Sequence, residues 1–408
     1  MPVSRGRSAV ALRYNSSVPA FIHLFSRTPR CALALITAAA VVATPAPVRS
    51  ACAPVGEWTI PGGGRVAAQE ILSRAAREQV VLLGEQHDNA DHHRWQLQTI
   101  SGLAALHPKI VLGFEMFPRR VQNVLDRWVA GELDEAAFLK ASEWSSVWRY
   151  EAVLYLPLFH FARLNRVPMV ALNIEREFVS EVGATGLEAV PQVRREGVTD
   201  PVPASEAYVN ELFAAYAEHP EKGRTAARSD PAFGLFVQAQ LVWDRAMAQA
   251  LAEAAGRGAL VIGVMGSAHI AGGHGVPHQL QSLGTTRIAS LLPWGPDSDC
   301  EKFSAGLATA VFGVPAARPA PPRPLLGITI GKASDGIGVI AVRPGSIAET
   351  AGLRAGDVLI EVAGSAVKAP GDVRPIVESM VPGTWLPLKI RRRSEIMELT
   401  AKFPPAAK

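Results

Sequence analysis

The stretch Val80-Val-Leu-Leu-Gly-Glu-Gln-His87 sets an unbroken apolar run directly before a glycine and a group of polar residues. A short apolar run of this kind predicts a strand that is buried on both faces. Three later runs have the same character, at 110–114, 167–172 and 259–264, and helix-like stretches lie between the runs at 92–105, 120–128, 154–163 and 232–255. Strands that alternate with helices predict a helix-rich, three-layer α/β domain around a mainly parallel sheet.

Polar side chains follow each of these predicted strands at once. Glu85 and His87 follow the first strand, Glu115 the second, Asn173 the third and His269 the fourth. Because the carboxyl ends of parallel strands form the ligand crevice of an open sheet, we expect these side chains to share one pocket. Six of the ten histidines lie in the short windows 87–93 and 269–278. This clustering favours a functional pocket over scattered polar loops.

Two kinds of chemistry suit such a pocket. The residues Glu85, His87, Glu115 and His269 could hold a divalent metal ion and activate water, with a carboxylate as the general base. Alternatively, the pocket and the aromatic stretch 144–160 could hold a large planar cofactor, since tyrosine phenolate is an axial ligand of ferric haem. Within that stretch we expect Trp144 and Trp148 to pack as one helix face. The residues themselves leave both kinds of chemistry open.

Other function classes lack their sequence signals. The chain has no P-loop, no complete Gly-x-Gly-x-x-Gly after a strand and no Gly-x-Ser-x-Gly elbow. The net charge of +4 comes from the two ends: residues 1–50 hold six arginines and no acid, and residues 323–408 hold 12 basic and 8 acidic residues. The remainder, 51–322, has 23 basic and 29 acidic residues. This acidic body argues against a nucleic-acid partner.

The first 50 residues have the order of a secretory signal. A basic stretch ends at Arg30, an apolar run covers 31–43, and small residues with prolines follow. We therefore predict an exported protein in the periplasm or at the outer membrane and cell envelope, with an uncleaved membrane anchor as the alternative. Cys52 stands where a bacterial lipoprotein would be lipidated, although Arg49 does not suit such a signal. Its other option is a disulfide with Cys300.

A proline-rich linker at 315–323 divides the mature chain. We predict the α/β domain at 51–314, after the leader of 1–50, and a small second domain at 324–403. A further alternative is a scaffold protein, in which only the second domain has a function and the crevice of the α/β domain has lost its own.

The larger domain resembles the ChaN-like haem-binding uptake family over roughly residues 65–300. The resemblance is carried by an ordered set of motifs, which includes Gly84-Glu-Gln-His87, Gly113-Phe-Glu-Met-Phe117, Tyr155-Leu-Pro-Leu158, Pro168-Met-Val-Ala-Leu-Asn173, Ala239-Gln240 with Trp243-Asp244, and Gly266-Ser-Ala-His269 with Gly275-Val-Pro277. The family is placed in a superfamily with Tiki proteases, TraB-like proteins and erythromycin esterases. The ChaN-like members are described as lipoproteins that hold haem between two subunits, with a tyrosine as the iron ligand.

The resemblance therefore implies haem as the cofactor and a possible homodimer. It makes Tyr155 the first candidate for the iron ligand, because Tyr155 lies within a matching motif, and Tyr150 the second. His87, His93 and His269 become the other haem-contacting candidates. The Tiki-like members are metal-dependent proteases, so the superfamily also keeps the metal-dependent hydrolase alternative open.

Residues 324–403 resemble a PDZ domain of the bacterial protease-associated type. The matching stretches are Pro324-Leu-Leu-Gly-Ile-Thr-Ile330 and the glycine-rich segment 344–364. The resemblance implies that a peptide or protein C-terminus binds there, with its carboxylate on backbone N–H groups and its side chain in an apolar pocket. The implied peptide-binding residues are Leu325, Leu326, Gly327, Ile328, Val373 and Val377.

Overall fold

A computed structural model describes residues 52–148, 150–218, 227–296, 298–317, 324–333 and 336–405. The predicted leader at 1–50 lies outside the described residues, as does most of the predicted linker. The α/β domain and the C-terminal domain are described below one at a time.

The first domain contains an eight-stranded sheet in the order β2-β1-β8-β7-β3-β6-β4-β5. The strands from β3 to β8 pair in parallel, and the two short strands β1 and β2 add an antiparallel edge. Their bounds are β1 Trp58–Thr59, β2 Arg65–Val66, β3 Val80–Glu85, β4 Ile110–Pro118, β5 Met169–Asn173, β6 Leu260–Gly266, β7 Ile288–Trp294 and β8 Ala310–Gly313.

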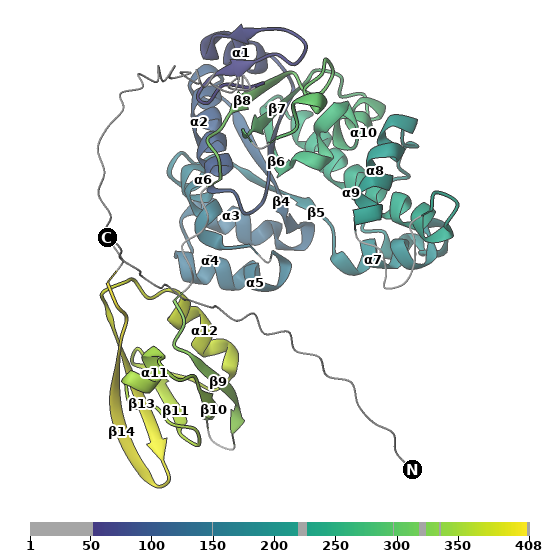
Figure 1. Cartoon of the computed structure of the whole chain (residues 1–408). Helices are drawn as coiled ribbons and strands as arrows, with labels where there is room; N and C mark the ends of the chain where they lie inside the picture. The colour runs from purple at the N-terminus through teal and green to yellow at the C-terminus, as the bar shows by residue number, and fades with distance from the viewer. Residues whose placement is uncertain are drawn as a thin grey trace, which may run out of the picture. The chain divides into compact units, whose positions relative to one another are not determined.

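Helices cover both faces of this sheet (Figure 1). Alternate residues of β3 explain the three layers, since Val81 and Leu83 pack into one apolar cluster and Val80 and Leu82 into the other. Helices α1, α2, α3 and α6 contribute to the first cluster, and α9 and α10 to the second. The helices are α1 Ala68–Ala75, α2 Ala90–Leu106, α3 Gln122–Ala130, α4 Glu135–Ala141, α5 Trp144–Val147, α6 Ala152–Leu164, α7 Arg176–Thr185, α8 Glu206–Glu218, α9 Pro231–Ala255 and α10 Val276–Ser282. The predicted fold class is confirmed.

The four predicted strands and the four predicted helices are all present, with ends that move by up to four residues. No strand lies in the described part of 174–258, as expected. The strands β1, β2, β7 and β8 were not predicted. Strand β7 contains Ser290 and Pro293, which interrupt its apolar pattern, and β8 has only four residues. Both are strands because a parallel neighbour pairs with them.

The C-terminal domain is a small antiparallel sheet with two helices. The strand order is β14-β13-β11-β10-β9, and β12 pairs with β11. The elements are β9 Ile328–Ala333, β10 Gly336–Val342, α11 Ile347–Thr350, β11 Val358–Val362, β12 Ser365–Ala366, α12 Pro370–Glu378, β13 Trp385–Arg392 and β14 Glu395–Lys402. The buried carboxylate of Asp357 accepts hydrogen bonds from Arg392 at 2.8 and 2.9 Å, which ties the start of β11 to the end of β13.

Cys52 and Cys300 form a disulfide with a Cα–Cα distance of 5.7 Å. The bond joins the segment before β1 to the turn after β7. The structure therefore has the disulfide alternative that the sequence left open for Cys52. Among the residues described here, no helix has the length and apolar character needed to cross a membrane.

Candidate functional site

The carboxyl edge of the sheet gathers the predicted side chains from β3, β4 and β6. Glu85, the last residue of β3, is buried at the centre of one half of this edge. Its carboxyl group accepts hydrogen bonds from Tyr155 Oη at 2.6 Å, from His87 Nδ1 at 2.8 Å and from Gln96 Nε2 at 3.0 Å. Three elements, β3, α2 and α6, are therefore fastened together at one buried carboxyl group.

Glu115, on β4, is the buried carboxylate of the other half. Its Oε2 accepts from the backbone N–H of Gly266 at 2.7 Å, whereas its Oε1 has no hydrogen-bond partner. The Nε2 of His269 forms an ion pair with that oxygen at 3.5 Å. Burial alone would raise the pKa of Glu115, but the positive charges of His269 and His87 hold it below its ordinary value.

His269 is held by a second carboxylate from α9. Its Nδ1–H donates to Asp244 Oδ1 at 2.6 Å, and the hydroxyl of Tyr208 donates to Asp244 Oδ2 at 2.7 Å. Burial would lower the pKa of His269, but Glu115 and Asp244 outweigh it and raise that pKa to about 10. At neutral pH the edge therefore holds a buried, protonated histidine between two carboxylates.

His87 lies between the two halves. Its Nδ1 is held by Glu85, and its ring meets Trp148 and Tyr150 at centroid distances of 4.7 and 5.0 Å. Burial works against its charge, but the hydrogen bond to Glu85 and the charge of Glu115 together raise the pKa of His87. Gly266 makes room for this ring, since a Cβ there would lie 3.2 Å from His87 Cε1.

The two candidate tyrosines differ in exposure. Tyr155, on α6, is 0% exposed, and its hydroxyl donates to Glu85 and to the carbonyl of His87. Burial and the nearby charge of Glu85 raise the pKa of Tyr155 far above its ordinary value. Tyr150 is 39% exposed and lies beside the His87 ring. Of the two, only Tyr150 presents its ring at the surface of the edge.

The histidine windows gather only in part. His93 is buried against Tyr155, with its Nε2 3.2 Å from the carbonyl of His87, and His92 accepts from the backbone N–H of Gln86. Burial lowers the pKa of His92 to about 4, so its ring is neutral. His274 and His278 instead contact the segment before α8, at Ser205 and Pro203.

Three polar residues of the site, Gln96, Tyr208 and Asp244, were not predicted as site residues. They lie within helices, where a polar residue usually faces solvent, and packing shows that they turn inward. The one sequence signal was that Asp244 lies in a stretch that resembles the family. Trp144 and Trp148 both pack in the core, but they do not form one helix face as expected, because α5 ends at Val147 and Trp148 is extended. The indole N–H of Trp144 donates to the carbonyl of Tyr150 at 2.9 Å. Within the described ranges, no group of three or more His, Cys, Asp or Glu side chains is arranged to hold a metal ion.

The C-terminal domain has its own groove, a cleft of about 530 Å³ between β9 and α12. The structure brings all six implied peptide-binding residues into its lining, which are Leu325, Leu326, Gly327, Ile328, Val373 and Val377. Gly327 has a φ of +83°, and a Cβ there would lie 2.3 Å from Ser346 Cβ. The loop before β9 therefore needs glycine at this position.

The comparisons with known proteins agree with this architecture. The model of the family described as "Haem-binding uptake, Tiki superfamily, ChaN" matches residues 71–280, and a PDZ domain model matches residues 338–392. The chain matches none of the curated proteins with which it was compared.

Solved structures match each domain separately. The structure titled "Cofacial heme binding to ChaN of Campylobacter jejuni" is 17% identical, with 63% of this chain and 98% of that chain covered and a TM-score of 0.48. The HtrA3 PDZ domain bound to a phage-derived ligand is 23% identical over 19% of this chain and 82% of its own, with a TM-score of 0.18. A serine endoprotease from Yersinia pestis is 25% identical over 21% of this chain and 30% of its own, with a TM-score of 0.19.

The family match covers the strands β3 to β6 and every residue of the carboxyl edge described above. It confirms the resemblance that the motifs indicated, and the cofactor of this family is haem. The chain belongs to the ChaN haem-binding uptake family of the Tiki superfamily, and it also carries a PDZ domain.

Proposed function

We propose that this protein binds haem at the carboxyl edge of the α/β sheet, with Tyr150 as the iron ligand. The observation that carries the proposal is the exposed ring of Tyr150, 5.0 Å from the ring of His87 and 5.6 Å from that of Trp148. A bound haem supplies an iron that a tyrosine phenolate can ligate. The aromatic surface around Tyr150 fits the apolar face of such a planar group.

Tyr155 has a different role in this proposal. Its hydroxyl is already occupied by Glu85 and by the carbonyl of His87, and its pKa is raised, so it is poorly suited to act as a phenolate ligand. It holds Glu85 in place, and Glu85 in turn orients the His87 ring. His93 supports the same turn from behind. In this proposal His87 is the histidine that contacts haem. His93 acts only through His87, whose backbone carbonyl it contacts, and His269 acts apart from the haem, beside Asp244 and Glu115.

The family resemblance includes haem held between two subunits, and we extend that to a homodimer here. Tyr150, two residues before α6, and Val153, in its first turn, both expose large side chains, and Val153 is 68% exposed. A haem on this surface would be covered on one face by these residues. A second copy of the chain would cover the other face.

The test is a haemin titration followed by visible absorption. Wild type is expected to give a saturable Soret shift with the charge-transfer band of an iron phenolate. Tyr150→Phe should lose that band, whereas Tyr155→Phe should keep it. Tyr216→Phe, on α8, is a matched control outside the edge. The absence of a saturable shift in wild type, or an unchanged spectrum in Tyr150→Phe, would overturn the proposal.

We also propose that the protein is exported and takes part in haem uptake or handling at the cell envelope. The leader-like order of residues 1–50 supports export, as does the Cys52–Cys300 disulfide, because such bonds persist in oxidising compartments. Cell fractionation of the full chain, combined with thiol alkylation before and after reduction, tests this. Recovery in the cytoplasm with both thiols free would contradict it.

The PDZ groove binds the C-terminus of a peptide or protein in this proposal. The loop at Leu325–Ile328 lines the groove, and its backbone N–H groups would take the carboxylate, while Val373 and Val377 of α12 would contact the last side chain. A library of fluorescent peptides with free or amidated C-termini tests this with the full chain. Equal binding of the free and amidated forms would rule out carboxylate capture.

A hydrolase at the same edge is the second candidate. The observation in its favour is Glu115, a buried carboxylate whose Oε1 lacks a hydrogen-bond partner and lies 3.5 Å from His269 Nε2. Glu85, His87, Glu115 and His269 would then carry proton transfer, but the described residues present no ready-made metal trio. Metal analysis and a peptide cleavage screen, with His87→Ala and His269→Ala as controls, test it. Equal cleavage by wild type and both variants would exclude it.

A further inference from the structure

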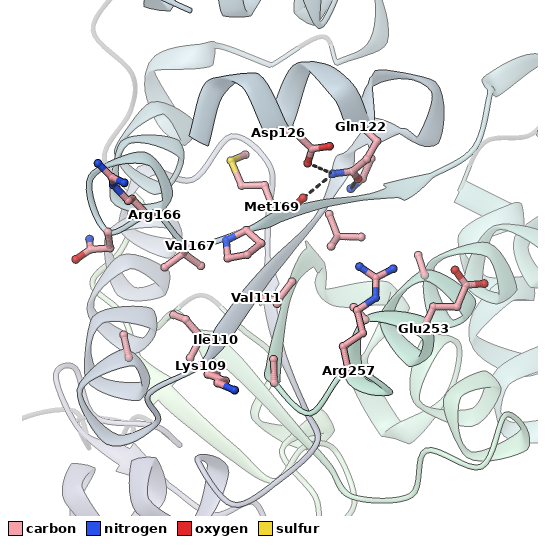
Figure 2. Close-up of a pocket in the computed structure, with 18 of the residues that line it drawn as sticks. Lys109, Ile110, Val111, Gln122, Asp126, Arg166, Val167, Met169, Glu253 and Arg257 are labelled. Atoms are coloured by element: carbon pink, nitrogen blue, oxygen red, sulfur yellow. Dashed lines mark hydrogen bonds between the residues drawn. The ribbon is translucent and has the colours of Figure 1, made fainter. Parts of the chain in front are cut away.

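A second cleft lies along β5, the last strand of the sheet. Figure 2 shows it between α3, β5 and the end of α9. Turns 107–109 and 165–168, before β4 and β5, close its other side. We call this space the β5 cleft. Its volume is about 910 Å³, which lies within the range of small-molecule sites. None of its lining residues belongs to the carboxyl edge or to the PDZ groove.

The backbone hydrogen-bonding groups on the open edge of β5 in this cleft are already occupied by a side chain. The amide of Gln122 accepts from the N–H of Ala171 at 2.9 Å and donates to the carbonyl of Met169 at 2.7 Å. These are the two backbone groups that an added strand would need. Gln122 also donates to Asp126 at 2.9 Å, which fixes its orientation (Figure 2). The cleft is therefore not built to receive a peptide strand.

Positive charge gathers around the cleft. Its lining has four cations and two acids, namely Lys109, Arg119, Arg166 and Arg257 against Asp126 and Glu253. Both acids have hydrogen-bond donors, from Gln122 and Gln249. In the described part of the chain, the side chains of Lys109, Arg166 and Arg257 have no hydrogen bond or ion pair. This excess of cations belongs to a domain that is acidic overall.

Arg119 adds a buried donor. Its two terminal nitrogens donate to the carbonyls of Glu196 and Ala246, at 3.1 and 2.8 Å, but its Nε is buried without a partner. Burial lowers the pKa of Arg119, although Glu253 and Glu196 oppose the shift. An unpaired buried donor is costly, and an acceptor in the cleft is one way to satisfy it.

Helix ends explain part of this charge but not the cleft. Arg166 and Arg257 follow the C-termini of α6 and α9 by two residues, where a cation complements the helix dipole. Arg77 follows α1 in the same way, yet it lines no part of the cleft. The difference is the apolar surface beside the cations, which includes Val111, Val170, Ala250 and Ala254.

We propose that the β5 cleft binds an apolar small molecule that carries one or more carboxylate groups. The aliphatic surface takes the apolar body, and Lys109, Arg166 and Arg257 take the carboxylates. This chemistry is shared by a long-chain fatty acid and by an iron-free porphyrin with its two propionates. The proposal does not depend on haem binding at the carboxyl edge.

Two fluorescent probes distinguish these two classes of ligand. The probe for a fatty acid is cis-parinaric acid, and the probe for an iron-free porphyrin is protoporphyrin IX. We expect saturable binding of at least one probe to the full chain. Arg166→Glu with Arg257→Glu should weaken it about tenfold or more, and Arg257→Gln should weaken it less. Binding should also weaken as salt rises. Arg77→Glu is the matched control, because it reverses the same charge after another helix.

Tyr150→Phe distinguishes binding in the β5 cleft from binding at the proposed haem surface, because removal of the Tyr150 hydroxyl should leave probe binding in the cleft unchanged. A thermal melt of each variant checks that the fold is retained, and the exposed positions of Arg166 and Arg257 favour this. The proposal is overturned if neither probe saturates, if the double variant binds as wild type does, or if Arg77→Glu or Tyr150→Phe weakens binding as much as the double variant does.

Discussion

Replacing Asp244 by Asn tests whether the buried network at the carboxyl edge is ionised. Asp244 is fully buried and accepts from His269 Nδ1 at 2.6 Å and from Tyr208 at 2.7 Å. The pKa of His269 rises from 6.5 to about 10. Since each pKa unit corresponds to about 1.4 kcal/mol, all the groups that hold this proton together contribute at most about 5 kcal/mol.

Asp244 shares that effect with Glu115, and Asn keeps the shape while it removes the charge. We therefore expect Asp244→Asn to lower the free energy of unfolding of the α/β domain by about 3 kcal/mol near pH 6, the range seen when a buried ion pair is broken. Glu70→Gln, which removes the exposed pair with Arg74, should cost under about 0.5 kcal/mol. Urea unfolding of the full chain, with the PDZ transition fitted separately, measures both.

The sign of the pH dependence follows from the raised pKa. His269 binds its proton more tightly in the folded protein, so its stabilising effect is complete below about pH 6.5 and is lost as the pH rises through 10. The wild type should lose stability over that window, and Asp244→Asn should lose less. Histidine NMR gives the pKa directly. A wild-type His269 that titrates near 6.5, together with a loss below about 1 kcal/mol in the variant, would refute the ionised network.

Three further changes test other parts of the molecule. Cys300→Ser should lower the free energy of unfolding of the α/β domain by about 2–4 kcal/mol relative to the oxidised wild type in thermal melts, and the reduced wild type, which lacks the same bond, should match the variant. Gly266→Ala should weaken haemin binding, because its Cβ would crowd the His87 ring at 3.2 Å, whereas Gly234→Ala in α9 meets no atom within 4 Å and should leave binding intact. Gly327→Ala should abolish peptide binding to the PDZ groove in a fluorescence titration, because a Cβ there clashes with Ser346, and Gly371→Ala, in open space, is its control.

The sequence predicted the central part of the fold because each central strand is a short apolar run followed by a polar turn. Parallel pairing then places Glu85, Glu115 and His269 at one edge, whatever the details of packing. Strand β8 carries no such signal, since its four residues become a strand through their pairing with β7 on one side and β1 on the other. Edge strands and short strands depend on partners that a local pattern does not contain.

The site was predictable only where its residues lie at the ends of the central strands. Residues at strand ends were found, whereas Asp244 and Tyr208 depend on how α8 and α9 rotate against the sheet. The choice between Tyr150 and Tyr155 also lay beyond the sequence. Both precede apolar helical residues, and only the burial of α6 shows that one hydroxyl is consumed by Glu85.

The two candidate functions use different sides of one shared residue, His87. Toward solvent, its ring faces Tyr150 and Trp148, a surface suited to a planar cofactor. Toward the interior, it adds positive charge beside Glu115, which also faces the protonated His269. Buried charges of this kind cost free energy unless they are paired, and here Glu115 is paired with His269 at 3.5 Å although its Oε1 accepts no hydrogen bond. Haem binding as proposed needs only the outer side, so the inner network either holds His87 in place or carries the proton transfer proposed for the hydrolase candidate. Because Glu85 fixes His87 from a third direction, the inner network is not required for its orientation, and the buried Glu115–His269 ion pair, whose Oε1 accepts no hydrogen bond, is the feature that holding the ring leaves unexplained.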